Sequence, residues 1–316
     1  MRFTIATFAL AFAGTASAHA TMFGVSVNGV DQGDGRNVYI RTPLDNGPVK
    51  DLASPNLACN TNGGEAAPSF VKAAAGDRLT FEWQHDNRGD DIIDPSHVGP
   101  IITYIAPFTT GNGAGPIWSK IAQDGFSNGV WAVDKLIANK GKNDFTLPAN
   151  LAPGKYLVRQ EIIALHEAET AFSANAARGA QFYPSCVQFE ISGSGTVVPN
   201  ENFDFNTGYT FADPGIVFNI YTAFSSYPIP GPAVFSGNGG GNGGGAAPPA
   251  PAPTSRPGSA PTAAPPAQNP NIPAPPAVQP PTTLQTSVRP SSPTGAPATQ
   301  PSSPCTPAQP ARRRRR

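Results

Sequence analysis

The chain has 316 residues, and its formal net charge of zero hides a division between two regions. Residues 19–235 carry 13 basic and 21 acidic residues, whereas residues 236–316 carry seven arginines and no acidic residue. An acidic domain with no apolar run long enough to cross a bilayer is neither a typical nucleic-acid-binding protein nor an integral membrane protein.

The first 18 residues have the pattern of a secretory signal peptide. Arg2 provides a positive start, an apolar stretch covers residues 3–13, and Ala16, Ser17 and Ala18 form a small-residue cleavage site. Cleavage after Ala18 predicts a secreted, extracellular protein whose first residue is His19. An N-terminal histidine offers two nitrogen donors, the free α-amine and the imidazole Nδ1, so it can chelate a metal ion as no internal histidine can.

Alternating apolar and polar residues predict strands across the region that follows. The pattern is clear at residues 23–27, 79–84 and 187–191 and less regular at residues 101–106 and 156–165. Clusters of Gly, Pro, Asn and Asp separate these segments, and long helical periodicity is weak. We therefore expect residues 19–235 to form one all-β domain, an immunoglobulin-like antiparallel β-sandwich with long loops.

The composition changes from Ser236 onward. Residues 238–245 are rich in glycine, and residues 246–310 are dominated by Pro, Ala, Ser and Thr. Such a segment buries too little apolar surface to offset its ordering entropy, so residues 236–316 are expected to be a disordered tail. The final run, Arg312–Arg316, is a solvated charge cluster or a means of attachment to acidic wall polymers.

Three cysteines occur in the chain. Secretion implies oxidising conditions, and Cys59 and Cys186 are the only pair within the domain, so a disulfide between them is expected. Cys305 lies in the tail and is left over, either free or paired with another molecule.

The chain has only four histidines: His19, His85, His97 and His166. Copper(II) favours amine and imidazole nitrogen, and His97 lies in a polar loop from which its ring can reach a surface site. Each histidine taken alone could equally be an ordinary structural or surface residue. Gln181 and Tyr183 are two residues apart in a predicted strand and therefore share a sheet face, either as simple packing or as a hydrogen-bond donor beside a phenol above a metal ion. If the strand before His166 is the neighbour of the Gln181 strand, His166 and Gln181 come close.

Six motifs in order along the domain resemble a fungal lytic polysaccharide monooxygenase of auxiliary activity family nine, formerly placed among the glycoside hydrolases. They are His19 after the signal peptide and residues 96–100 (SHVGP), 161–166 (EIIALH), 179–184 (GAQFYP), 213–216 (DPGI) and 227–232 (YPIPGP). The resemblance covers residues 19–235 and not the tail.

The resemblance implies a role for each matching residue. His19, through its amine and Nδ1, and His97, through Nε2, would hold one copper ion in a histidine brace, with Tyr183 at the axial position. His166 and Gln181 would hydrogen-bond to oxygen species near the copper. Tyr227 would stack on a sugar ring, or else be a tyrosine packed beside a Pro-rich turn. Cys59–Cys186 would match the family's disulfide, and His85 has no assigned role.

The resemblance also implies an activity. The chain would be a monomeric monooxygenase that cleaves cellulose or a related β-1,4-glucan, with hemicellulose as a second candidate substrate. It would use O₂ or H₂O₂ and electrons from a secreted flavocytochrome or from phenolics. The short region between Asn28 and Cys59 favours oxidation at C1 over C4. Two departures from the family concern stability and targeting: no second disulfide is available in the domain, and the tail lacks the pattern of a cellulose-binding module.

Two other functions remain open at this point. A hydrolytic glycosidase needs two carboxylates beside the scissile bond, and Glu161 and Asp213 are present, although neither is convincingly positioned by its sequence context. The second alternative is a non-catalytic copper- or polysaccharide-binding protein of the cell wall.

Overall fold

The computed structural model describes residues 19–237. The predicted signal peptide, residues 1–18, and residues 238–316 with Cys305 and Arg312–Arg316 lie outside the described residues. No helix within residues 19–237 has the length and hydrophobicity needed to span a membrane.

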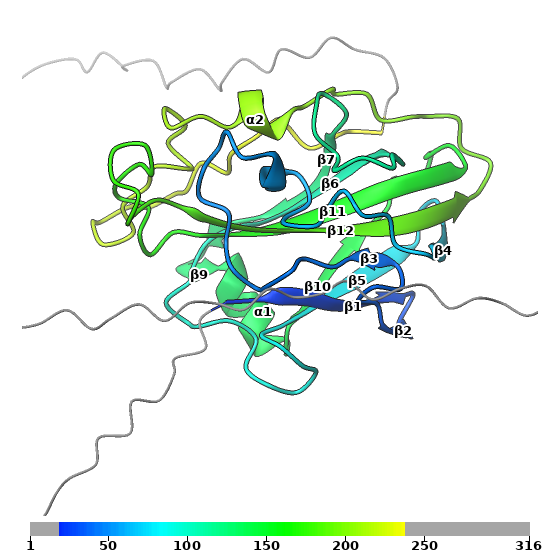
Figure 1. Ribbon diagram of the computed structural model, residues 1–316, viewed down its shortest axis with the longest axis horizontal. Coiled ribbons are helices and arrows are strands. Elements are labelled where there is room, and N and C mark those ends of the chain that lie inside the picture. Colours follow the sequence, from blue (N-terminus) through cyan, green and yellow to red (C-terminus); the bar gives the residue numbers. More distant parts are fainter. Residues whose placement is uncertain (1–18, 238–316) are drawn as a thin grey trace, which may run out of the picture. The chain divides into compact units, whose positions relative to one another are not determined.

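Two β-sheets lie over one another as layers (Figure 1). The smaller sheet has the strand order β10-β5-β1-β2: Lys142–Thr146, Arg78–Gln84, Thr21–Val27 and Val30–Asp34. The larger sheet has the order β3-β12-β11-β6-β7: Ile40–Arg41, Gln181–Ser192, Gly154–Ala164, Ile101–Pro107 and Ser119–Asp124. All these pairs are antiparallel, and only β4 (Val71–Ala74) adds in parallel, against β12. The predicted antiparallel β-sandwich is confirmed.

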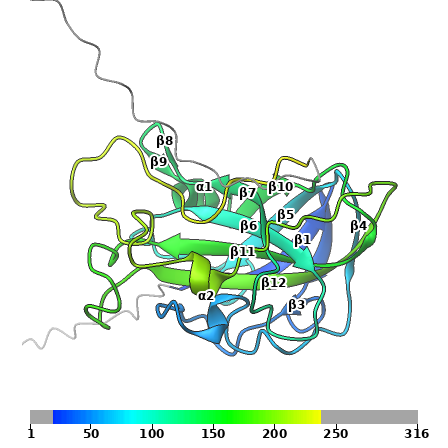
Figure 2. The same ribbon diagram turned by 90° about the horizontal axis from the view of Figure 1, so that it is seen from above.

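The remaining regular elements of the described residues are short. They are η1 (Pro55–Leu57), the hairpin β8 (Phe126–Ser127) and β9 (Val130–Trp131), α1 (Ala132–Ala138) and α2 (Phe205–Gly208). Figure 2 shows α1 beside the β8–β9 hairpin at one end of the sheets. Although helix α1 has only two turns, one of its sides is buried in the core between the sheets. The helix is therefore part of the sandwich.

The burial pattern explains why some strands alternate clearly and others do not. In β5 the predicted apolar residues Leu79, Phe81 and Trp83 are at most 1 % exposed and face the core between the two sheets. The larger sheet is covered on both faces: Tyr183 packs into that same core, whereas its neighbour Phe182 packs into a second core beneath the loops and the C-terminal segment. Strands buried on both faces read as continuous apolar runs, which accounts for the irregular patterns of β6 and β11.

Strands β11 and β12 are neighbours over their whole length, with Ala164 opposite Gln181. The sequence did not determine whether these two strands are neighbours. Their pairing brings His166, which follows β11, to the start of β12. The loop before β6 extends the same edge, because Leu165 donates its backbone N–H to the carbonyl of Val98 at 2.9 Å.

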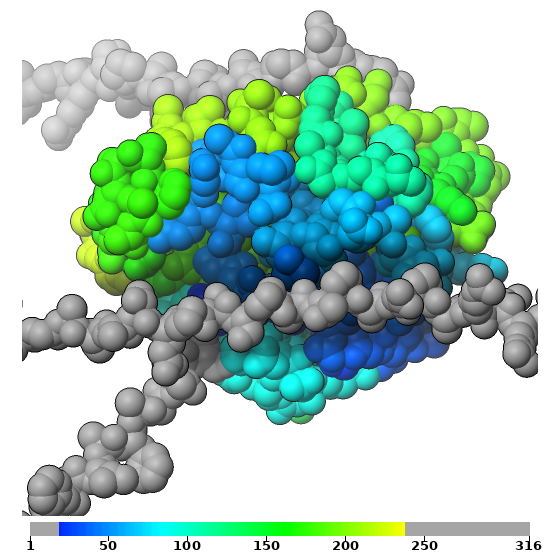
Figure 3. Space-filling model, viewed as in Figure 1, coloured from blue at the N-terminus to red at the C-terminus, as the bar shows by residue number. Residues whose placement is uncertain are grey.

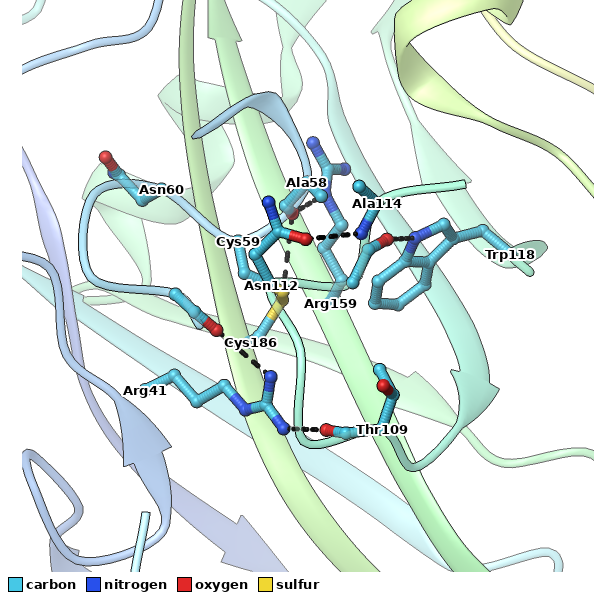
Figure 4. Close-up of a disulfide and its surroundings, with 12 residues drawn as sticks. Arg41, Ala58, Cys59, Asn60, Thr109, Asn112, Ala114, Trp118, Arg159 and Cys186 are labelled. Carbon is cyan, nitrogen blue, oxygen red and sulfur yellow. Dashed lines mark hydrogen bonds between the residues drawn. A yellow bond between two sulfur atoms is a disulfide. The ribbon is translucent and has the colours of Figure 1, made fainter. Parts of the chain in front are cut away.

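The predicted disulfide between Cys59 and Cys186 is confirmed, and it joins residues 127 positions apart with a Cα–Cα distance of 5.3 Å. It fixes the segment around η1 to β12 (Figure 4). Beside it the buried guanidinium of Arg159 donates to the carbonyls of Ala58 (2.6 Å) and Leu57 (2.8 Å). A long irregular segment is thereby held against the larger sheet by one covalent and two charge-assisted contacts.

Candidate metal centre

Three rings from distant parts of the sequence meet at one edge of the sandwich. The ring centres of His19 and His97 are 6.2 Å apart, and the ring of Tyr183 lies 5.9 Å from that of His19 and 6.2 Å from that of His97. His19 lies two residues before the start of β1, His97 lies in the loop before β6, and Tyr183 is in β12. The two sheets together therefore build the site, one supplying His19 and the other supplying its partners.

The loop that carries His97 is fixed by local geometry. Asp94 accepts the backbone N–H of both Ser96 and His97, through its side chain (2.8 Å) and its carbonyl (2.9 Å), which forms a tight turn. Gly99 then passes so close to β11 that a Cβ there would lie 1.8 Å from the carbonyl oxygen of Ile163. A residue without a side chain is needed at Gly99 for the loop to pack at this distance.

The imidazole of His97 is suited to bind a metal ion. It is 4 % exposed, and burial is the main cause that lowers its pKa from 6.5 to about 4, so the ring is neutral at ordinary pH. Its Nδ1 lies 3.2 Å from the hydroxyl of Ser96. Its Nε2 is buried and, among the described residues, has no hydrogen-bond partner. A buried polar atom without a partner is costly, and a metal ion would satisfy it.

The separation of the two histidine rings also fits a shared metal ion. Metal–imidazole bonds are about 2 Å long, so two rings that bind one ion from opposite sides have centres about 6 Å apart. The 6.2 Å between His19 and His97 matches this spacing. Nitrogen donors suit copper, zinc and nickel, and copper(II) has the highest affinity for such a site.

A chain of polar side chains adjoins these rings. The Tyr183 hydroxyl donates to Oε1 of Gln181 at 2.7 Å, and Nε2 of Gln181 lies 3.3 Å from Nε2 of His166. The His166 ring packs against the His97 ring with centres 4.0 Å apart. Burial raises the pKa of Tyr183 well above its ordinary value, so the phenol keeps its proton. The five residues singled out by the sequence, His19, His97, His166, Gln181 and Tyr183, thus lie together.

Glu167 also belongs to this cluster, although no sequence motif singled it out. Its Oε2 accepts from Nε2 of Gln181 at 3.0 Å and from Nζ of Lys50 at 3.2 Å. The only available signal was its position next to His166, and adjacency in sequence does not show which way a loop side chain points.

Tyr227 does not lie on an open face, and the prediction that it stacks on a sugar ring is wrong. It is 8 % exposed, its hydroxyl donates to the carbonyl of Gly215 at 2.5 Å, and its ring packs 5.0 Å from that of Trp131 and 5.1 Å from that of Phe218. A ring enclosed by other rings cannot receive a sugar. The exposed tyrosine is Tyr221, which is 69 % exposed and donates its hydroxyl to the carbonyl of His166 at 2.9 Å.

The remaining ionisable residues considered from the sequence have other surroundings. Nδ1 of His85 lies 3.6 Å from a carboxylate oxygen of Asp91, in the loop that follows β5. Glu161 is fully buried in a 2.7 Å ion pair with Arg159 and accepts the hydroxyl of Tyr209 at 2.6 Å. Because a hydrolytic carboxylate must reach the glycosidic oxygen, Glu161 is a structural residue and the glycosidase alternative loses one of its two carboxylates.

Comparisons with known proteins agree with this geometry. The profile of Auxiliary Activity family 9 (formerly GH61) matches residues 19–227. The chain is 64 % identical over 225 residues to "AA9 family lytic polysaccharide monooxygenase A" of Collariella virescens, covering 70 % of this chain and 82 % of that protein. It is 48 % identical over 241 residues to "AA9 family lytic polysaccharide monooxygenase B" of Emericella nidulans, covering 75 % of this chain and 65 % of that protein.

Solved structures give the same result. The structure named CvAA9A is 62 % identical and superposes with a TM-score of 0.69 over 69 % of this chain and 99 % of that one. The extended catalytic domain of LPMO9A from H. jecorina is 31 % identical, with a TM-score of 0.58 over 71 % of this chain and 96 % of that one. By sequence and by fold, the chain therefore belongs to Auxiliary Activity family 9, the fungal lytic polysaccharide monooxygenases.

Proposed function

We propose that the chain is a secreted copper monooxygenase that cleaves the glycosidic bonds of cellulose oxidatively. The observation that carries the proposal is the buried Nε2 of His97, which has no hydrogen-bond partner in the part of the chain that the structure describes. It lies beside the ring of His19, at a spacing that one metal ion would bridge. Membership of a copper-dependent family of polysaccharide monooxygenases gives copper as the ion and oxidation as the chemistry.

Three residues would hold the copper. His19 would contribute its α-amine, once residues 1–18 are removed, together with Nδ1, and His97 would contribute Nε2. The Tyr183 hydroxyl would face the copper as a neutral phenol, because burial keeps its proton in place. When bound, copper supplies the one-electron redox chemistry that no side chain here can provide.

The polar residues beside the rings would control protons and orientation. Tyr183 gives its only hydroxyl proton to Gln181, so its oxygen lone pairs remain available to the metal site. His166 lies against His97 and within reach of the Gln181 amide, where it can hold or transfer a proton close to the reacting oxygen.

Tyr221 is the residue we propose to bind the polysaccharide. Its ring is exposed, and its hydroxyl is fixed to the backbone of His166, so the ring is held close to the metal site. An exposed, oriented aromatic ring provides an apolar face on which a sugar ring can stack.

Substrate and co-reactants follow the family and the sequence. We propose cellulose or a related β-1,4-glucan as substrate, hemicellulose as a second one, O₂ or H₂O₂ as oxidant, and a secreted flavocytochrome or phenolics as electron donor. Oxidation is proposed at C1, at C4 or at both, with C1 favoured, and the protein is proposed to act as a monomer. The matched relatives are named as lytic polysaccharide monooxygenases, and their names specify none of these details.

The test uses protein secreted from the full-length gene. We expect amino-terminal sequencing to begin at His19, and incubation with cellulose, copper and ascorbate to release oligosaccharides oxidised at C1, detected by mass spectrometry. His97→Ala and a variant with one alanine inserted before His19 should both lose this product. Release of unmodified reducing ends would indicate hydrolysis, and tight copper binding without any soluble product would indicate the non-catalytic cell-wall protein.

A further inference from the structure

Glu167 is the meeting point of charged and polar groups from two segments far apart in the sequence, one around Lys50 and the other around Arg178 and Gln181. Its Oε2 accepts from Gln181 Nε2 at 3.0 Å and from Lys50 Nζ at 3.2 Å, and its Oε1 lies 3.6 Å from Nη1 of Arg178. The carboxylate is three-quarters buried. Two cations therefore hold it in place, and within residues 19–237 the one neutral group that donates to it is the side-chain amide of Gln181.

The amide of Gln181 has two orientations of almost equal shape, which differ in whether its oxygen or its nitrogen faces a given partner. An ionised carboxylate only accepts hydrogen bonds, so Glu167 requires the NH₂ group of Gln181 on its side. The opposite orientation would place two oxygens against each other and would turn NH₂ toward the Tyr183 hydroxyl. Glu167 thus excludes one of the two orientations.

The orientation of Gln181 decides the state of Tyr183. With its NH₂ toward Glu167, Gln181 presents Oε1 to the Tyr183 hydroxyl, which donates to it at 2.7 Å. The second amide proton is then directed to Nε2 of His166, 3.3 Å away, so that Nε2 accepts and the proton of a neutral His166 lies on Nδ1. One carboxylate outside the ring cluster therefore sets the hydrogen-bonding roles of both Tyr183 and His166.

The position of Glu167 is itself fixed by the fold. Lys50 follows Val49, whose backbone exchanges two 2.8 Å hydrogen bonds with Phe182, the residue between Gln181 and Tyr183. Glu167 and Arg178 lie in the loop from β11 to β12. Figure 3 shows the blue segment before β4 next to the green loop between β11 and β12. Both segments are held to the same strand that carries Gln181 and Tyr183.

We infer that Glu167 is a positioning residue of the metal site: its carboxylate fixes the side-chain amide of Gln181, which in turn orients the hydroxyl of Tyr183 and the ring of His166. The inference rests on the proposed function for its consequence in catalysis. Its structural content, a fixed amide, is independent of any metal ion.

The experiment compares three variants with the wild type. Glu167→Ala removes the acceptor, Glu167→Gln keeps an oxygen acceptor without the charge, and Glu169→Ala is the matched control. Glu169 lies in the same loop and pairs with the same Arg178, with a similar exposure of 26 %, but has no hydrogen bond to Gln181 among the described residues. If Glu167→Ala does not fold, Glu167→Met, which retains the bulk of the side chain, takes its place.

The first measurement uses metal-free, ¹⁵N-labelled protein. The side-chain NH₂ resonance of Gln181, assigned by its loss in Gln181→Leu, should exchange with solvent slowly in the wild type, in Glu167→Gln and in Glu169→Ala. It should exchange at least about 10-fold faster in Glu167→Ala, because the amide has lost its acceptor. Equal exchange in Glu167→Ala and the wild type would overturn the inference.

The second measurement uses the copper-loaded enzyme. Glu167→Ala should alter the Cu(II) electron paramagnetic resonance spectrum and lower oxidised product formation about 10- to 100-fold, as loss of a group that orients metal ligands commonly does. Glu167→Gln should restore the wild-type spectrum. The inference would be overturned if Glu169→Ala changed the spectrum as much as Glu167→Ala does. It would also be overturned if Glu167→Gln did not restore the wild-type spectrum. A wild type that binds no copper would overturn the proposed function, while the amide measurement would still stand.

Discussion

Two tyrosines only six positions apart, Tyr221 and Tyr227, have opposite surroundings and should respond differently to the same substitution. Tyr221→Ala removes an exposed ring, so we expect the free energy of unfolding to stay within about 0.5 kcal/mol of the wild type. Its affinity for cellulose should fall, because the proposed stacking surface is lost. Chemical denaturation and a cellulose pull-down measure the two quantities.

Tyr227→Ala is the matched comparison. It leaves a cavity among Trp131, Phe218 and their neighbours and removes a buried hydrogen bond to Gly215, so we expect a loss of about 3–5 kcal/mol in the free energy of unfolding. Unchanged cellulose binding by Tyr221→Ala, or an unfolding free energy of Tyr227→Ala equal to the wild type, would contradict the assignment of these two residues.

The site residues differ in how far the sequence could reveal them. His19 was predictable from the cleavage site, and Gln181 and Tyr183 were predictable as a pair because a strand places residues two apart on one face. Tyr221 and Tyr227 lie in a segment without regular structure, where no period tells a buried ring from an exposed one. Glu167 depends on Lys50, 117 positions away, and that contact exists only in the folded chain.

At the scale of elements, the loop before β6 determines where His97 lies, and Gly99 is the residue that allows it to approach β11. Gly99→Ala would place a Cβ 1.8 Å from the Ile163 oxygen, a backbone atom that cannot move aside as a flexible side chain could. The loop must therefore shift, and three backbone hydrogen bonds shift with it, made by Val98, Gly99 and Pro100.

We expect Gly99→Ala to lower the free energy of unfolding by about 1–3 kcal/mol, the usual range for overpacking. Copper affinity, measured by calorimetry on the folded variant, should fall as well, because His97 moves away from His19. Gly129→Ala, in the β8–β9 turn, is the control: its Cβ would meet no atom within 4 Å, although its φ of +80° carries its own strain. Copper affinity as low in Gly129→Ala as in Gly99→Ala would contradict this account.

The alternating sequence pattern predicted strands clearly where one face of the strand is polar, as in β1 and β5. The pattern was irregular where both faces are buried, as in β6 and β11. Short elements such as α1 and β3 gave no signal, because seven and two residues are too few to show a period. The parallel pairing of β4 with β12 could not be predicted either, since β4 pairs with a strand more than 100 positions away, and nothing local to either strand specifies it.

At the scale of the whole domain, the C-terminal segment is fastened to the edge strand β7 at one buried cation, Lys120. Its ammonium, in a side chain 1 % exposed, donates to the carbonyl of Pro230 and to Oε1 of Gln123, both at 2.8 Å. Its backbone N–H donates to Glu201 at 2.9 Å, and its carbonyl accepts from Phe235 at 2.7 Å. Both ends of the segment after β12 thus converge on one residue.

Lys120 should give the stability of the domain a characteristic pH dependence. Burial is the main cause that lowers its pKa from 10.5 to about 8 in the folded protein. Between these values the unfolded chain holds the proton and the folded chain does not, so the free energy of unfolding rises with pH across this window. Across the full window the free energy of unfolding rises by about 3 kcal/mol.

The measurement compares the wild type with Lys120→Met, because tyrosines contribute an opposite trend at high pH. Burial raises the pKa of Tyr104, Tyr209 and Tyr227 well above the ordinary value, so above about pH 10 the unfolded chain loses protons that the folded chain keeps. Subtracting the variant removes this shared trend.

We expect the unfolding free energy of the wild type, relative to Lys120→Met, to increase by about 2–3 kcal/mol between pH 7.5 and 10. The exposed Lys72, replaced by Met, is the control, and a wild-type–Lys120→Met difference that stays flat or falls across this range would contradict the prediction.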